Sequence, residues 1–590
     1  MKKVKVKQVL LSIFLIAVIA LIIWAVIYIR KNPINMNALP VKKKSMLMTG
    51  KTYIPYEPSE QSQTSAAGTA NKPDVSAKGD EGASDIKDDS AAILLTLRYP
   101  DPITRFYTTK RANIFTFSGL GNFAEVTEVL SVLRSTGSTA TFFVTQEELE
   151  TKGELIRLIK SWGNSLGISM RPDAFETVEE MKEALLNIRE ILTDAYKCTE
   201  KLYIRPVYYS DMDILMAAAA ACDMEIMTQY KEVVTDMVSR MTNVEDAFNA
   251  AISPKEGMFQ RGEIIHFQMD YMQYGDRLLS QLVQLMIRRQ CPYPVMAADA
   301  VAADTSKLYT YPLPEDAILP EVKDKIWPGH LSGYTNEMIM DVIANGYLGI
   351  DWVNTRHFLP GFEVSEIRRM NKKGLIDNTG NFVFLTFDDW GTDGTVDRLL
   401  QVLKKHGATA TFFVRTEYVP YNPNLLRAIA EEGHTIADHS HRHIKLSNEV
   451  TATEYAELTQ EQVDILRDDL VTSYQVLQSI VGDLRDPYGK PSLSTLFRPP
   501  TMAVSKSGLT TVFDVGYTHS ISGFYSMRDY SAEDPRLLAD LLKRKIRSGA
   551  VLVMHFSDTA IYTAEALDIC LSELEAEGKY FTYVGLNAVY

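Results

Sequence analysis

The sequence predicts an α/β protein in which one parallel strand–helix fold occurs twice, behind a single transmembrane helix. Three observations lead to this prediction. A long segment repeats without gaps, the repeated segment alternates short strand-like runs with helical ones, and an uncharged apolar run lies near the N-terminus. The chain has 590 residues, more than one core accommodates at about 100–200 residues per domain. Several domains are therefore expected.

The repeat pairs residues 115–144 with residues 385–414 at a constant separation of 270 positions, as Thr116 and Thr386 illustrate. The first segment reads FTFSGLGNFAEVTEVLSVLRSTGSTATFFV and the second reads LTFDDWGTDGTVDRLLQVLKKHGATATFFV. Both contain apolar residues at spacings of three and four, the rhythm of a helix with one buried face. Chance similarity of two such units is the alternative, and the gapless length argues against it. The alignment indicates two copies of one fold.

Each copy is expected to begin with strand, loop, helix, strand and helix. Residues 382–387 and 410–414 are short aromatic and β-branched runs, which strands prefer. Helices between such strands serve as crossovers, and crossovers give parallel strands. Residues 293–301 resemble residues 581–589, so the copies also end alike. The predicted domains are a first copy at 92–303, a connector with helices at 304–378 and a second copy at 379–590.

The N-terminal region differs from the rest of the chain. The apolar run at residues 9–29 is long enough to cross a hydrocarbon core of about 30 Å as a helix. More basic residues precede it than directly follow it, so the positive-inside rule places the N-terminus in the cytoplasm. We expect residues 1–31 to form a cytoplasmic tip and an uncleaved single-pass anchor in the cell membrane, with a cleaved signal peptide as the alternative. Residues 32–91 are expected to be a largely disordered extracellular linker, followed by extracellular domains.

Composition excludes some classes of function. The net charge is −14 and the isoelectric point is about 5.4, which argues against nucleic-acid binding because that needs a basic face. The four cysteines are widely spaced and fit neither a zinc finger nor a disulfide framework. We expect them to be buried free thiols, with a bridge between Cys198 and Cys222 as the alternative.

Two segments of the second copy carry side chains typical of a metal site. Asp388 and Asp389 end a strand, and adjacent carboxylates after an apolar strand are costly without a partner. His439 and His443 are four positions apart, so on one helical turn both would face one ion, with His441 pointing elsewhere. A carboxylate and two histidines suit catalytic Zn²⁺, and other divalent metals also fit. Taken singly, a loop-forming acidic pair and a solvated polar loop are the alternatives.

Two later segments place polar groups after short apolar runs. Arg498 lies in the turn FRPP, and His555 ends the strand VLVMH. Each alone is more often structural than catalytic. In a barrel of parallel strands, however, residues that follow the strand ends gather at one face, where active sites of such barrels lie.

The second copy therefore contains an ordered series of motifs: TFDD at 386–389, HSHRH at 439–443, FRPP at 497–500, Asp529-Tyr530, and VMH at 553–555. The series resembles the polysaccharide deacetylases with a NodB-type homology domain, which form carbohydrate esterase family 4. The resemblance covers about 210 residues, and its first two motifs are the most specific. It implies a distorted (β/α) barrel of NodB type, present twice in this chain.

The resemblance also implies a metal and its ligands. Asp389, His439 and His443 would bind one divalent ion. Zn²⁺ is expected first, with Co²⁺, Ni²⁺ or Mn²⁺ as alternatives.

Four further roles follow from the same resemblance. Asp388 would be the general base, oriented by Arg498. His555 would be the general acid that protonates the leaving amine, tuned by Asp529.

Three positions depart from the family pattern and are expected to line the substrate pocket. Trp390 stands where the family usually has glycine, Val553 where it has leucine, and Tyr530 where it has tryptophan. The last departure bears on the role of Asp529, its neighbour.

The first copy has lost the predicted ligands. At the same separation Asp388 and Asp389 become Ser118 and Gly119, and the two histidines become Ser169 and Asp173. Arg205-Pro206 remains as a relic of the arginine motif, and the segment ending in His266 resembles the last strand. We interpret this copy as a degenerate, non-catalytic domain that serves as a scaffold or holds glycan.

The sequence thus favours an exported hydrolase that removes N-acetyl groups from N-acetylglucosamine of peptidoglycan and releases acetate. A wall-binding or structural protein with an idle site is one alternative. A deacetylase of a different surface glycan, or of a small amide, is another.

Overall fold

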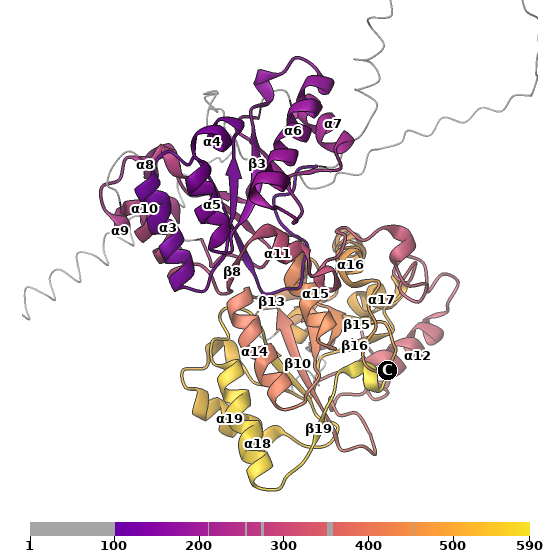
Figure 1. Cartoon of the computed structure of the whole chain (residues 1–590). Helices are drawn as coiled ribbons and strands as arrows, with labels where there is room; N and C mark the ends of the chain where they lie inside the picture. Colours follow the sequence, from indigo (N-terminus) through magenta and orange to yellow (C-terminus); the bar gives the residue numbers. More distant parts are fainter. Residues whose placement is uncertain (1–100, 210–211, 254–255, 273–276, 351–357, 452–453) are drawn as a thin grey trace, which may run out of the picture. The chain divides into compact units, whose positions relative to one another are not determined.

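The structure is a computed structural model that describes residues 101–590, except 210–211, 254–255, 273–276, 351–357 and 452–453 (Figure 1). The predicted membrane anchor and linker lie outside the described residues. Within the described part of the chain, no helix combines the length and the apolar character that crossing a membrane requires.

The first copy is a curled parallel sheet flanked by helices. In sheet order its strands are β5 (Glu225–Ile226), β4 (Tyr203–Pro206), β3 (Ser165–Met170), β2 (Thr141–Val144), β1 (Asn113–Ser118), β7 (Ile264–Gln268) and β6 (Lys231–Glu232), and β8 (Val295–Met296) also pairs with β1. Its helices are α3 (Phe123–Ser135), α4 (Gln146–Thr151), α5 (Gly153–Ser161), α6 (Val178–Tyr196), α7 (Met212–Ala221), α8 (Asp236–Ser239), α9 (Val244–Ala251), α10 (Leu278–Arg289) and α11 (Ala298–Ala302).

The second copy repeats this topology. In the corresponding order its strands are β16 (His519–Ile521), β15 (Leu493–Phe497), β12 (Thr435–Asp438), β11 (Thr411–Val414), β10 (Phe382–Asp389), β18 (Val551–His555) and β17 (Tyr525–Ser526), with β19 (Thr582–Tyr583) beside β10. Its helices are α14 (Asp393–Lys405), α15 (Pro423–Glu431), α16 (Gln460–Val481), α17 (Lys506–Asp514), α18 (Pro535–Lys545) and α19 (Thr563–Ala576). A small antiparallel hairpin, β13 (Asn448–Thr451) and β14 (Glu454–Ala456), follows β12. The shared strand order supports the repeat inferred from sequence.

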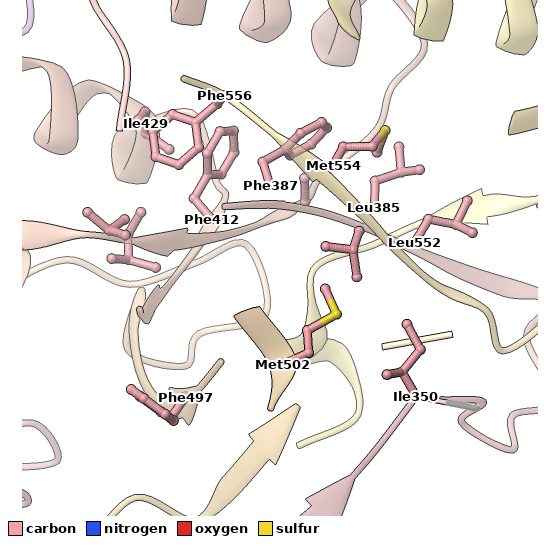
Figure 2. Close-up of a cluster of buried hydrophobic side chains, with 14 of the residues drawn as sticks. Ile350, Leu385, Phe387, Phe412, Ile429, Phe497, Met502, Leu552, Met554 and Phe556 are labelled. Atoms are coloured by element: carbon pink, nitrogen blue, oxygen red, sulfur yellow. The ribbon is translucent and has the colours of Figure 1, made fainter. Parts of the chain in front are cut away.

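The central strands are buried on both faces, as parallel strands covered by helices are. In β10, Leu385 and Phe387 pack with Phe412 and Leu552 in the large core of this copy (Figure 2). Phe384, from the same strand, belongs to a smaller cluster on the other face. This two-sided burial explains why the strands are nearly continuous apolar runs that end abruptly in polar residues.

The connector is part of the second copy's structure. It contains α12 (Asn336–Gly346), the short strand β9 (Tyr347–Leu348) and α13 (Val364–Ile367). β9 pairs in parallel with β16 and so extends the sheet beyond the strand order of the first copy. The backbone N–H of Trp327 also donates to the carbonyl of Val515 at 2.8 Å. No role for this segment could be predicted from the sequence, whereas in the structure its strand β9 forms the edge of the second sheet.

A buried ionic network links the two copies, which belong to one compact unit. The Arg261 guanidinium, shortly before β7 of the first copy, donates to Asp393 at 2.7 Å and to Asp397 at 3.0 Å. The Tyr293 hydroxyl donates to Asp393 at 2.6 Å, and Asn422 donates to the other oxygen of the same carboxylate. Because α14 begins at Asp393, the network holds the end of the loop that follows Asp389.

The cysteines fit the prediction of free thiols. All four are unbridged, and Cys198, Cys222 and Cys570 are buried while Cys291 is half-buried.

Candidate functional site

The structure brings Asp389, His439 and His443 together at the strand ends of the second sheet. The Nε2 atoms of His439 and His443 lie 3.8 Å and 3.7 Å from Oδ1 of Asp389. The two imidazole rings are edge-on, with their centroids 5.0 Å apart. Among the described residues this is the group whose ligand atoms, all within 4.8 Å of one another, could hold a metal ion.

The donor set fits a divalent cation. Bonds of about 2.0–2.2 Å to one ion leave donor atoms up to about 4.4 Å apart, which accommodates the carboxylate–imidazole distances. Nδ1 of His439 lies 2.9 Å from the carbonyl oxygen of Arg498. A proton on Nδ1 satisfies that carbonyl and leaves the Nε2 lone pair for a metal. Burial, with a contribution from His443, lowers the pKa of His439 to about 3, so the ring is neutral at physiological pH.

The two histidines lie on a loop, so the predicted helical turn is wrong. The strand β12 ends at Asp438, and the residues after it are not helical. Ser440 and His443 have positive φ values of 66° and 60°, which fold the loop back on itself. Such a conformation is costly for a non-glycine residue and is typical of functional sites. His441 points elsewhere, as predicted, and its Nδ1 lies 3.0 Å from the Thr416 hydroxyl.

Asp388 and Arg498 form a buried pair beside the metal-site cluster. The Arg498 guanidinium donates to Asp388 Oδ1 at 2.6 Å and to the Thr386 hydroxyl at 2.7 Å. Its Nε donates to the carbonyl of Ile521, and its plane lies 4.0 Å from the Phe413 ring. Burial raises the pKa of Asp388, while the charge of Arg498 opposes this effect. The predicted orienting contact is therefore present.

His555 lies across the strand pair from Asp388, since these two residues are register partners of β18 and β10. Its Nδ1 is 2.7 Å from Asp529 Oδ1, and its backbone N–H donates to Asp529 Oδ2 at 2.8 Å. The Thr563 hydroxyl donates to the same Oδ2. Burial works against the imidazolium, but the hydrogen bond and charge of Asp529 outweigh it and raise the pKa of His555. A protonated histidine held in this way is suited to act as a general acid.

The three predicted pocket residues occupy different depths. Tyr530 is about half exposed, and its ring stands edge-on to His555 with centroids 4.9 Å apart. Trp390 is partly buried and packs edge-on against Phe556. Val553 is fully buried in β18. Of the three, Tyr530 is the residue with a ring contact to the site, through His555.

Sequence reasoning missed two supporting residues. Thr386 accepts the second hydrogen bond of Arg498, and the TFDD motif contained it without indicating a role. Asp438 is fully buried and accepts hydrogen bonds from Tyr517 at 2.6 Å and from Ser473 at 2.9 Å. It thereby fixes the start of the histidine loop. Its position directly before His439 could have indicated a supporting role, but its hydrogen-bond partners lie far away in the sequence.

In the first copy the equivalent positions are polar but lack the ligand set. The strand pairing of β1 with β7 places Gln268, and not His266, at the position of His555. The segment that ends in His266 does correspond to the last strand, but His266 itself matches Val553 and so lies two residues before the position of His555. Arg205 does match Arg498. Arg205 lies in β4, which pairs with β3, and Arg498 directly follows β15, which pairs with β12 in the same way.

Known proteins resemble the second copy. Residues 376–520 match the family model described as polysaccharide deacetylase. The peptidoglycan-N-acetylmuramic acid deacetylase PdaA of Bacillus subtilis is 27% identical over 199 residues, which are 34% of this chain and 68% of that protein. The peptidoglycan-N-acetylglucosamine deacetylase PgdA of Listeria monocytogenes is 26% identical over 238 residues, 40% of this chain and 43% of that protein.

A solved structure of B. subtilis PdaA, described as a family 4 carbohydrate esterase, is 25% identical to this chain. It covers 36% of this chain and 82% of its own, with a TM-score of 0.30. The family model spans the motifs from Asp388 to Arg498. Residues 376–520 are therefore similar to the polysaccharide deacetylase family, and both relatives are named as enzymes that deacetylate peptidoglycan.

Proposed function

We propose that the second copy removes N-acetyl groups from N-acetylglucosamine in peptidoglycan and releases acetate. The observation that carries the proposal is the joint placement of a three-ligand cluster, a buried carboxylate and a protonatable histidine at one set of strand ends. The relative PgdA, named as a peptidoglycan-N-acetylglucosamine deacetylase, supports the choice of sugar, and PdaA, named for N-acetylmuramic acid, supports the choice of polymer alone.

Asp389, His439 and His443 would hold one divalent cation, with Zn²⁺ as the first expectation. When bound, such an ion polarises the amide carbonyl and lowers the pKa of water towards about 7. Asp388 removes the proton of the attacking water, because its buried carboxylate has a raised pKa and so is a stronger base than an exposed aspartate. Arg498 binds Oδ1 and leaves Oδ2 to accept that proton.

His555 completes the reaction by giving its proton to the leaving nitrogen. An amine departs much more readily than an amide anion, so the C–N bond breaks as the proton arrives. Asp529 holds the ring through Nδ1, which leaves Nε2 to face the substrate. The products are acetate and a free amino sugar.

Acetate release from defined substrates tests the proposal. The purified chain, supplied with Zn²⁺, is incubated with peptidoglycan, with acetylated glucosamine oligomers and with a small amide such as acetamide. We expect release from the glycans, loss after chelation and recovery on adding metal back. Bound metal with no release from any glycan would overturn the proposal and favour a wall-binding protein with an idle site. Release from the small amide alone would favour the other alternative.

We also propose that residues 9–29 anchor the chain in the cell membrane, with the later domains outside. The support is the apolar run and the basic residues before it. Protease added to intact cells should remove the domains and leave the N-terminus protected. Protection of the domains would contradict this orientation.

The contact between Asp529 and His555 predicts a pH effect. The general acid must be protonated, so activity falls as the pH rises through the pKa of His555. Asp529→Asn removes the charge that raises this pKa, and the alkaline limb of the pH–rate profile should move to lower pH. Near neutral pH we expect a loss of about 10-fold to 100-fold, the range for partners that orient a site group.

The profile of kcat against pH measures this shift. Asp540→Asn, which changes an exposed carboxylate on α18, is the matched control and should leave both limbs in place. An unchanged alkaline limb in Asp529→Asn would show that His555 is not the group that titrates.

A further inference from the structure

The strand-end face of the first copy keeps buried polar groups that its lost chemistry does not explain. Arg205, the match of Arg498, is only 6% exposed and donates to Gln229 at 2.7 Å. Glu232 lies 3.5 Å from its other terminal nitrogen. Ser118, at the position of Asp388, is buried, and its hydroxyl has no hydrogen-bond partner among the described residues. Buried charges and unpaired hydroxyls cost free energy, so a mere scaffold would be more stable with apolar residues here.

The space of the missing metal ligand is filled by a different carboxylate. Gly119 has a φ of 81°, and its counterpart Asp389 has a φ of 80°, so both copies have the same left-handed φ at this position. A Cβ at position 119 would lie 2.3 Å from Oδ1 of Asp270. Gln268 donates to the same oxygen at 2.7 Å. The site therefore excludes the original ligand but still presents hydrogen-bonding groups.

Exposed aromatic rings border this polar floor. Tyr208 and Tyr209 follow β4 and are each 48% exposed, and Tyr271 follows β7 and is 50% exposed. The Tyr209 hydroxyl donates to Gln229, the residue that Arg205 also contacts. The pKa of Tyr271 is raised, first by burial and then by its neighbours Asp270 and Tyr208. Rings gathered from two strand ends beside one polar cluster are typical of a binding surface rather than of scattered surface residues.

The chemistry of this face selects its ligand. A tyrosine offers a flat apolar face together with a hydroxyl, and sugar rings offer apolar C–H faces bordered by hydroxyl and amide groups. Both cations of this face have a carboxylate partner, since Arg205 faces Glu232 and Arg171 is paired with Asp173 at 2.9 Å, and Asp270 adds a further carboxylate. A face without excess positive charge favours a neutral ligand over an anion such as a stem-peptide carboxylate.

We propose that the face formed by Ser118, Arg205, Tyr208, Tyr209, Asp270 and Tyr271 binds a neutral N-acetylated glycan strand without hydrolysing it. The choice of this polymer rests on the proposed function of the second copy. Binding the same polymer at two places in one chain raises the local concentration of substrate at the catalytic copy. The first copy thereby increases activity on long strands and leaves activity on short oligomers unchanged.

Co-sedimentation with insoluble peptidoglycan tests the binding, using the full chain with Asp388→Asn so that the polymer is not altered. Tyr208→Ala combined with Tyr271→Ala should weaken binding about 10-fold or more, because linked sites contribute gains of this size. Tyr580→Ala, which removes a tyrosine that is 72% exposed elsewhere, is the matched control and should bind like the parent. Ser118→Ala gives a second variant that keeps the fold, and a smaller loss is expected there. Equal thermal unfolding midpoints show that all variants are folded.

Kinetics separate this inference from the proposed function. In the active chain, Tyr208→Ala combined with Tyr271→Ala should raise the amount of peptidoglycan that gives half the maximal rate about 10-fold. The kcat/KM for a short acetylated oligomer should stay unchanged. If the variants sediment and turn over polymer like the Tyr580→Ala control, the glycan site is refuted and the enzyme stands. If the chain releases no acetate but the variants still lose binding, the enzyme proposal fails and the glycan site stands.

Discussion

Asp388→Asn should reduce kcat for acetate release by about 10²–10⁴-fold, the contribution of a positioned general base. The side chain keeps its size and an oxygen that can accept from Arg498, but it no longer takes a proton from water. The three metal-site residues are untouched, so the variant should still bind one divalent ion per chain. Initial rates at saturating glycan, together with metal content of the folded variant, measure the effect.

Asp483→Asn is the matched control for this substitution. Asp483 also accepts from an arginine, Arg427, at 2.8 Å and 2.9 Å, but on a distant surface of the second copy. It should leave kcat unchanged. If Asp388→Asn retained more than about a tenth of the parent rate with metal bound, Asp388 would not be the base.

Arg261→Ala should lower the free energy of unfolding by about 3–5 kcal/mol, the usual cost of breaking a buried ion pair by removing one partner. The arginine is almost fully buried, and its loss leaves Asp393 as a buried carboxylate with no cation paired to it among the described residues, while Asp397 keeps the partly exposed Arg111 at 3.2 Å. The Tyr293 hydroxyl satisfies hydrogen bonds but carries no charge. Denaturant unfolding followed by circular dichroism measures the change.

Arg289→Ala provides the comparison for Arg261→Ala. Arg289 pairs with Glu245 at 2.8 Å, but both side chains are about half exposed. Exposed pairs contribute about 0–1 kcal/mol, so this variant should unfold almost like the parent. Equal stabilities of the two variants would show that the buried network does not hold the copies together.

The sequence predicted the parts of the site that are set by strand ends. Asp388, Arg498 and His555 each follow an apolar run, and parallel strands bring such ends to one edge. The repeat likewise predicted the shared strand order, because a constant separation between matching segments preserves the order of elements.

Other features could not be predicted, for identifiable physical reasons. The spacing of His439 and His443 suits a helix, but positive φ values at Ser440 and His443 bring them together on a loop, and spacing does not report φ. The strand β9 has two residues and shows no periodicity. The residue of the first copy that matches His555 could not be read from the repeat, because the separation between the copies changes before their last strands, and only pairing with β1 fixes the register.

We predict that Asp389, His439 and His443 hold one divalent cation beside Asp388 and His555. Anomalous X-ray scattering at the zinc edge, from crystals of the chain grown with Zn²⁺, tests it most directly. We predict one strong peak at about 2.0–2.2 Å from His439 Nε2, His443 Nε2 and an Asp389 oxygen. No peak between these three side chains, or a peak held by other residues while they remain unliganded, would contradict the account.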